Sequence, residues 1–195
     1  MYRFANALSY ILHPAVFVLL TVALMSGRLH HRTVFVLRDI AIPAAGLLPG
    51  LIYIYRKTRS GEFSHYHLLF KEERRVVLPL LLAGLTASFG LYALAQAHAV
   101  MMRCMLIGVC GGIGACLINL FWKISLHSAV AMGCAALFLP FSMVTVVQMG
   151  ALGIIVGISR IMVRHHSPAQ VFGGWIYGFG VTAALVWLLN RYRGG

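Results

Sequence analysis

The sequence predicts an all-α fold, a polytopic transmembrane helical bundle of six to seven spans. Of its 195 residues, 61% are hydrophobic and 10% are charged, whereas soluble domains carry about 25% charged residues. The hydrophobic residues form runs of the length needed to cross a bilayer, about 20 residues each. Seven such runs would use about 140 positions, so we expect residues 1–195 to form a single integral membrane domain.

Short polar connections separate the expected spans. These are 8–25, 34–55, 76–95, 101–121, 126–139, 144–163 and 169–189. The apolar run 124–163 is too long for one span, and Pro140 near its middle predicts a turn between two. Arg38 and Asp39, near the start of the second span, are expected to pair or to reach the interface.

The charge of the chain is strongly positive. Lys and Arg number 16 against four Asp and Glu, a net charge of +12. This balance indicates basic loops that bind anionic membrane lipids, or a site for a polyanionic ligand. Nucleic acid is excluded as a partner because the cations are scattered among the spans. Since no acidic residue follows Glu73, the carboxylate cluster that hard metals need is missing there, and we expect no metal and no cofactor.

Three polar segments interrupt the apolar runs, at 71–79, 123–127 and 159–170. Cations and imidazoles at the end of a span are costly unless a polar cavity receives them, so they indicate a functional site. Each segment is two predicted crossings from the next, and all three are therefore expected on one membrane face. The distribution of cations does not decide which face this is, because most cations there are candidate ligand-binding residues.

These segments carry a resemblance to a known family. Ser159-Arg160, five residues and then His166 resemble the third signature of the type 2 phosphatidic acid phosphatase superfamily, SR-x5-H-x3-D. Ser125-Leu126-His127 is similar to the second, (P)SGH, and Lys71 followed by Leu78-Pro79 resembles the first, K-x6-RP. Gln170 stands where the family has Asp, Leu126 where it has Gly and Leu78 where it has Arg.

The resemblance implies a membrane lipid phosphatase that works without metal through a phospho-histidine intermediate. His166 would be the nucleophile, and His127 would protonate the leaving oxygen. The substrate would be a phosphate monoester or diphosphate of a lipid, of the isoprenyl phosphate, phosphatidate, phosphatidylglycerol phosphate or lipid A type. The wider pattern is similar to a bacterial branch, which places the protein in the bacterial inner membrane.

The chemistry of the residues agrees with these roles. A phosphate ester needs cations to neutralise its oxygens, an in-line nucleophile and an acid for the leaving group. The planar guanidinium of Arg160 can bind two phosphate oxygens. Gln170, four residues after His166, can accept its ring N–H but cannot stabilise an imidazolium as a carboxylate does. Further candidates for binding phosphate are Lys71, Arg74, Arg75, Lys123, Ser125, Leu126 through its amide, and Ser159.

Other interpretations remain open. His127 alone is more often a packed polar residue than a catalyst, and Arg160, Arg164 and the two histidines 165–166 could form a basic turn at the interface. The five-residue gap selects His166, so His165 is expected to be a neighbour. A catalytically weak phospholipid-binding or regulatory protein is one alternative function. A small transporter or channel is another, although its polar groups would line the midplane. The sequence does not define the oligomeric state.

Overall fold

The structure, a computed structural model, describes residues 11–63 and 71–191, and these fold into helices joined by short connections. No strand occurs among the residues described. The helices are α2 (Pro14–Leu29), α3 (Thr33–Arg59), α4 (Lys71–Leu94), α5 (Ala99–Phe121), α6 (Leu126–Ala136), α7 (Met143–Met162) and α8 (Pro168–Arg191). The all-α prediction is confirmed.

Five of these helices, α3, α4, α5, α7 and α8, are long and apolar enough to cross a membrane. Their ranges match five predicted spans to within a few residues, and they indicate an integral membrane protein. Large apolar side chains on them are exposed, such as Phe121, Val147 and Ile176, as expected for surfaces that face lipid.

The two remaining predicted spans, 8–25 and 126–139, correspond to shorter helices. α6 has 11 residues and a length of about 16 Å, roughly half of the hydrocarbon thickness. It ends at Ala136 because the chain turns over 137–141, where Pro140 lies, and Ser142 then caps α7 by accepting the Thr145 amide at 3.2 Å. The predicted turn at Pro140 is therefore confirmed, but α6 is shorter than a full span. α2 has 16 residues and also falls below the length of a span.

Parts of the predicted polar connection 56–75 are helical. α3 continues through Arg59 and α4 begins at Lys71. Basic side chains stabilise the last turn of a helix and acidic ones the first turn, and α4 has Glu72 and Glu73 in its first turn. In the connection itself, a hydrogen bond from Lys57 lowers the pKa of the Glu62 carboxyl, with a smaller effect of Ser60.

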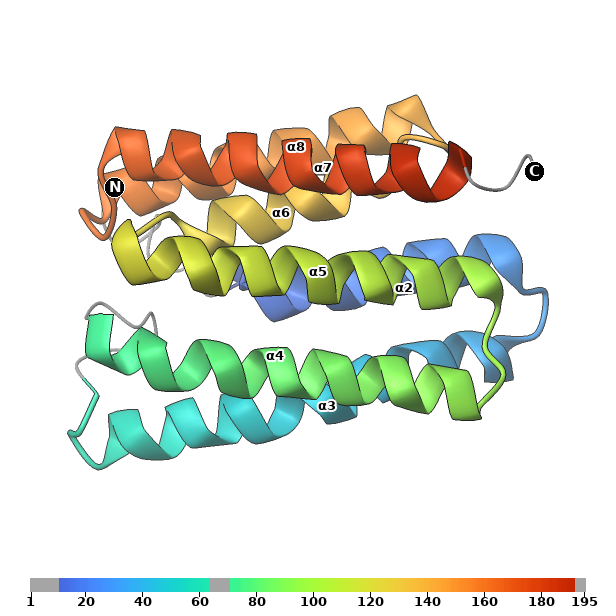
Figure 1. The fold of residues 1–195 in the computed structure, drawn as a ribbon, viewed down its shortest axis with the longest axis horizontal. Coiled ribbons are helices and arrows are strands. Elements are labelled where there is room, and N and C mark those ends of the chain that lie inside the picture. Colours follow the sequence, from blue (N-terminus) through green and yellow to red (C-terminus); the bar gives the residue numbers. More distant parts are fainter. Residues whose placement is uncertain (1–10, 64–70, 192–195) are drawn as a thin grey trace. The chain divides into compact units, whose positions relative to one another are not determined.

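The chain divides into two compact units. The first combines the described part of Met1–Leu20 with that of Ile124–Gly195, and the second is Thr21–Lys123. Figure 1 shows the helices of each: α6, α7 and α8 in the first, and α3, α4 and α5 in the second. That both belong to a single membrane domain stays a prediction.

In the first unit, α8 packs very closely on α6. A Cβ built on Gly178 would lie 2.0 Å from the carbonyl oxygen of Ala129, and one on Gly174 would lie 2.6 Å from that of Ser125. These glycines are four residues apart and face α6 on one side, the arrangement that lets helix backbones approach in lipid. The contact holds the first residues of α6 and α8 at the same end of the unit.

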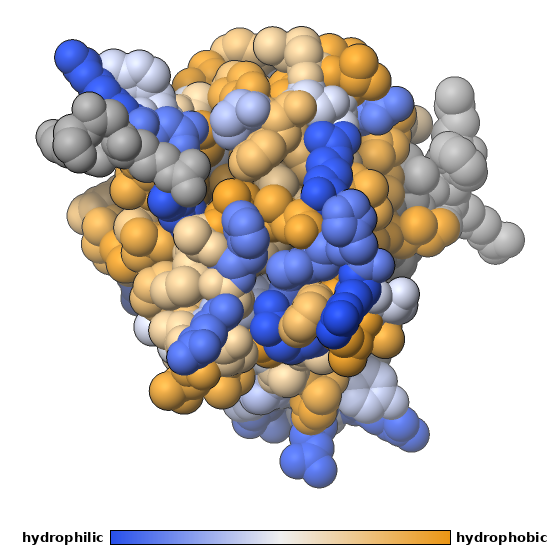
Figure 2. All heavy atoms as spheres, turned by 90° about the vertical axis from the view of Figure 1, so that its right-hand side faces the viewer, coloured by the Kyte–Doolittle hydropathy of each residue, from blue (hydrophilic) through white to orange (hydrophobic). Residues whose placement is uncertain are grey.

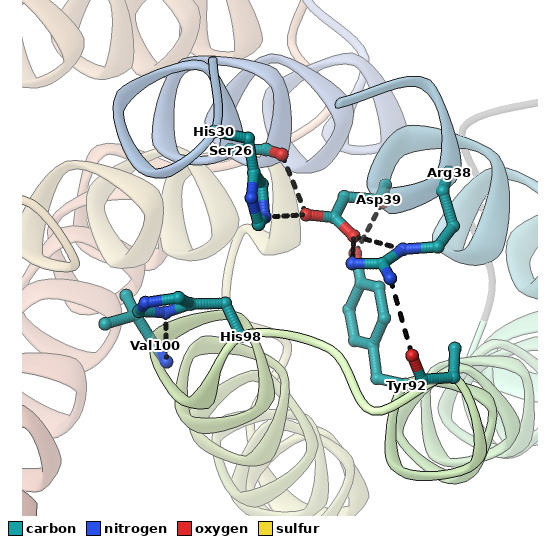
Figure 3. A network of polar contacts seen from close by, with 8 residues as sticks. Ser26, His30, Arg38, Asp39, Tyr92, His98 and Val100 are labelled. Atoms are coloured by element: carbon teal, nitrogen blue, oxygen red, sulfur yellow. Dashed lines mark hydrogen bonds and ion pairs between the residues drawn. The ribbon is translucent and has the colours of Figure 1, made fainter. Parts of the chain in front are cut away.

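In the second unit, one buried residue, Asp39, joins three helices through its side chain and its backbone carbonyl (Figure 3). Asp39 of α3 is fully buried. It accepts Arg38 Nε at 3.0 Å and Nη2 at 2.8 Å, and Ser26 Oγ of α2 at 2.7 Å. His30 Nε2 lies 3.3 Å away, and the Tyr92 hydroxyl of α4 donates to the Asp39 backbone carbonyl. The predicted pairing of Arg38 with Asp39 is confirmed.

This group, which we call the Asp39 cluster (Ser26, His30, Arg38, Asp39 and Tyr92), lies at the end of the second unit that holds the α2–α3 and α4–α5 connections. Figure 2 views this end, where hydrophilic side chains gather among hydrophobic ones. Both carboxylate oxygens of Asp39 already accept hydrogen bonds from Ser26 or Arg38. The cluster therefore stabilises the packing of the helices and does not resemble an open ligand site.

Candidate functional site

The candidate site lies in the first unit, where α7 turns into α8. Val163 caps α7, and Arg164 follows with a left-handed φ of 56°. The Arg164 amide donates to the Ile161 carbonyl at 2.9 Å, and the His165 amide donates to that of Arg160 at 3.1 Å. These two bonds form a Schellman motif, in which glycine usually occupies the left-handed position. The motif reverses the chain within four residues and brings two histidines back toward the last turn of α7.

Arg160 is fully buried at the end of α7. Its Nη2 lies 2.8 Å from Nδ1 of His165. Because guanidinium nitrogens are donors only, Nδ1 of His165 accepts, and this ring is neutral in the contact. His165, which the sequence predicted to be only a neighbour, thus directly orients the guanidinium.

His166 is buried and contacts Gln170, as the spacing predicted. Nδ1 of His166 lies 3.2 Å from Gln170 Oε1. The same Gln170 atom accepts the Ser167 amide at 3.1 Å, so it must be the oxygen and not the side-chain nitrogen. Nδ1 of His166 therefore carries its proton, and the lone pair of the neutral ring is at Nε2.

Gln170 also completes a helix cap. The Gln170 amide donates to Ser167 Oγ at 3.3 Å while its side chain accepts the Ser167 amide. This reciprocal pair is a capping box, with Pro168 at the favoured first helical position of α8. Gln170 therefore has a structural role at the start of α8 in addition to its contact with His166.

The start of α6 is attached to the same end of α8. The Ser125 amide donates to the Gln170 carbonyl at 3.0 Å. The Ser125 hydroxyl caps α6, accepting the Ser128 amide at 3.4 Å and the Ser128 hydroxyl at 2.9 Å. His127, in the first turn of α6, is buried. The amide of Leu126, at the first position of α6, is among the groups that a helix leaves without an intrahelical acceptor.

His13 is a further member of this site that the three polar segments do not predict. His13 immediately precedes α2, and its ring meets the ring of His127 edge to face, with centroids 5.6 Å apart and an interplanar angle of 85°. The His13-Pro14 pair in an apolar segment was the available signal, because Pro at the first position of a helix favours a capping residue before it.

The other predicted phosphate-binding residues lie in different settings. The Ser159 hydroxyl donates to the Val156 carbonyl at 2.7 Å, so it would have to rotate before donating to a phosphate. Lys71, Arg74, Arg75 and Lys123 belong to the second unit, where Lys71 is the first residue of α4. Arg74 is buried and donates to Asn119 Oδ1 at 3.0 Å, whereas Arg75 is exposed. A role for these four cations in the site stays a prediction.

The described residues include no group of three or more His, Cys, Asp or Glu side chains arranged to hold a metal ion. The side chains that make up this site are the Arg160 guanidinium, the imidazoles of His13, His127, His165 and His166, and the Gln170 amide. Such a set can bind an anion and move protons, and His166 Nε2 can act as a nucleophile.

Comparison with known proteins gives no match. No protein-family model, no curated protein and no solved structure is similar enough to this chain to indicate a relationship.

Proposed function

We propose that this protein is a membrane lipid phosphatase that hydrolyses a phosphate monoester or diphosphate of a lipid through a phosphorylated His166. The proposal rests on one observation above all. Within the segment from Arg160 to Gln170, the chain holds a buried guanidinium in contact with the His165 ring, and the next residue, His166, has its Nδ1 proton fixed by the Gln170 amide oxygen. An anion-binding cation next to an oriented nucleophile is the minimum that phosphoryl transfer requires.

The proposed reaction has two steps. His166 Nε2 attacks phosphorus in line as the bond from phosphorus to the lipid oxygen breaks, and His127 gives its proton to the leaving oxygen. A water molecule then attacks the phosphorus, gives a proton to His127, and the nitrogen–phosphorus bond breaks to release phosphate. Arg160 neutralises charge on the phosphoryl oxygens in both steps. The lipid tail would stay in the bilayer while the headgroup reaches the start of α6 and α8.

Gln170 determines how fast such an enzyme would be. Its oxygen orients His166, but it carries no charge to stabilise the imidazolium that forms. We therefore expect slower turnover than the same site would have with a carboxylate at this position.

The finer membrane arrangement belongs to the same proposal. We infer six to seven crossings in a bacterial inner membrane, with 71–79, 123–127 and 159–170 on one face. Lys71, Arg74, Arg75 and Lys123 would then add positive charge for the substrate phosphate. The membrane partners would be the lipid phosphate substrate and anionic lipids, and the reaction would need no metal and no cofactor.

One observation favours a second function, a catalytically weak phospholipid-binding or regulatory protein. Because Gln170 forms a capping box with Ser167, its position is explained by helix stability alone. Under this alternative, Arg160 and the histidines would bind a lipid phosphate without cleaving it.

Phosphate release by the purified protein separates the two functions. Protein in lipid nanodiscs is incubated with a panel of lipid phosphates, with and without EDTA, beside the His166→Ala and His165→Ala variants. We expect release that survives chelation, is lost almost entirely in His166→Ala and is reduced less in His165→Ala. Binding of the same lipids without release by the wild type would support the lipid-binding alternative.

A further inference from the structure

Two histidines of the chain begin helices in the same way. The ring of His13 accepts the Ala15 amide through Nδ1 at 3.2 Å, just before α2, and the ring of His98 accepts the Val100 amide through Nδ1 at 3.2 Å, just before α5. A capping ring that accepts at Nδ1 cannot be protonated there without losing the cap. Both rings are therefore neutral while they cap, with their proton at Nε2.

Because His13 contacts another imidazole, its helix cap also affects where that pair of rings holds a proton. Its ring contacts that of His127, which we propose as the proton donor. Like charges at such separations disfavour one another, so a second proton on the pair is unfavourable. The helix cap keeps His13 neutral, and a proton taken up by the pair therefore resides on His127.

We propose that His13 is a positioning residue that reserves the single proton of the His13–His127 pair for His127 and holds the His127 ring in place. This inference rests on the proposed function for its catalytic part, but the placement of the proton on His127 is a property of the two rings and does not depend on turnover. The proposal adds His13, the residue before α2, to the site. The residue spacing within 123–127 and 159–170 does not predict this residue.

The chain supplies a matched control. His98 makes the same capping contact and also meets another imidazole, that of His30, with centroids 6.0 Å apart and an interplanar angle of 85°. It lies in the second unit, whereas His13 and His127 belong to the first. Asparagine is a strong helix cap, so His13→Asn and His98→Asn each keep a cap and remove one imidazole.

The test has two readouts on full-length protein in nanodiscs. The first is kinetic: His13→Asn should lower kcat by about 10- to 100-fold, as expected for impaired general acid catalysis, with KM within about twofold and an altered pH profile of kcat. His98→Asn should leave all three unchanged. If His13→Asn matches the wild type while the wild type releases phosphate, the role of His13 is overturned and the phosphatase stands.

The second readout does not depend on turnover. The ¹⁵N resonances of His127, assigned by their loss in His127→Gln, are followed against pH in ¹⁵N-histidine-labelled protein. We expect two steps in the wild type and in His98→Asn, because the rings titrate as a coupled pair, and one step in His13→Asn. Identical curves in all three proteins would overturn the proposal, whether or not the wild type releases phosphate. His13→Ser, another cap residue, replaces His13→Asn should that variant fold poorly by circular dichroism.

Discussion

Replacing Gly178 by alanine should displace α8 and disable the site from a distance. The new Cβ would lie 2.0 Å from the Ala129 carbonyl oxygen and 2.7 Å from its carbon, whereas carbon–oxygen contacts of this kind are about 3.3 Å or longer. The backbones must therefore separate by about 1.3 Å. If α8 moves away from α6 by this distance as a rigid helix, the 3.0 Å bond from the Ser125 amide to the Gln170 carbonyl breaks. Hydrogen bonds weaken beyond about 3.2 Å.

The expected cost is about 1–3 kcal/mol of stability, as for overpacked cores. Phosphate release should fall by about 100-fold, because a misplacement of about 1 Å at a catalytic group has that effect. Stability is followed by circular dichroism during thermal unfolding in detergent, and turnover by phosphate release in nanodiscs.

Gly180 provides the control on the same helix. A Cβ built there meets nothing within 4 Å, so Gly180→Ala should keep full activity and gain up to about 1 kcal/mol from the better helix propensity of alanine. Equal activity and stability of Gly178→Ala and Gly180→Ala would show that close packing of α8 on α6 does not position the site.

Three further substitutions test separate parts of the structure. Gln170→Glu keeps the capping box and adds a carboxylate beside His166, so phosphate release should be retained or raised. Gln170→Ala should release phosphate about 10- to 1000-fold more slowly. Equal rates for Gln170→Ala and wild type would mean that Gln170 does not orient the nucleophile. Asp39→Asn should lower the free energy of unfolding by about 1.5–3 kcal/mol, because the bonds from Ser26 and Arg38 lose their charged acceptor; an unchanged thermal midpoint would contradict the structural role of the Asp39 cluster. Arg164→Gly should raise stability by about 1 kcal/mol, because glycine adopts the left-handed φ without strain, and should leave phosphate release unchanged; a loss of stability would argue against the Schellman motif.

The sequence predicts the long helices well because hydrophobic length alone defines them. α3, α4, α5, α7 and α8 follow from apolar runs of the right length, and Pro140 marks the turn between α6 and α7. Composition does not determine where α6 stops within an apolar run, because residues 137–141 remain hydrophobic while forming a turn.

Local spacing also predicts part of the site. The four-residue separation of His166 and Gln170 predicts their contact, and Ser167-x-x-Gln170 could have been read as a capping box. The contact of Arg160 with His165 was missed because it depends on the left-handed φ of Arg164, which side-chain spacing does not reveal.

Contacts between distant segments were not predictable from the same signals. His13 lies more than one hundred residues before His127, and no periodicity joins them. Likewise, the pairing of Arg38 with Asp39 was predicted from adjacency, while Ser26 and Tyr92 entered the Asp39 cluster through tertiary packing.

Trapping the proposed phospho-histidine tests the phosphatase mechanism most directly. Protein in nanodiscs is mixed with a cleavable lipid phosphate, quenched in alkali, where phospho-histidine is stable, and analysed by peptide mass spectrometry. We expect phosphate on His166 of the wild type, attached at Nε2 because Nδ1 is held by Gln170, and none in His166→Ala. Phosphate release without any modified His166, or phosphate attached to His165 instead, would contradict this mechanism.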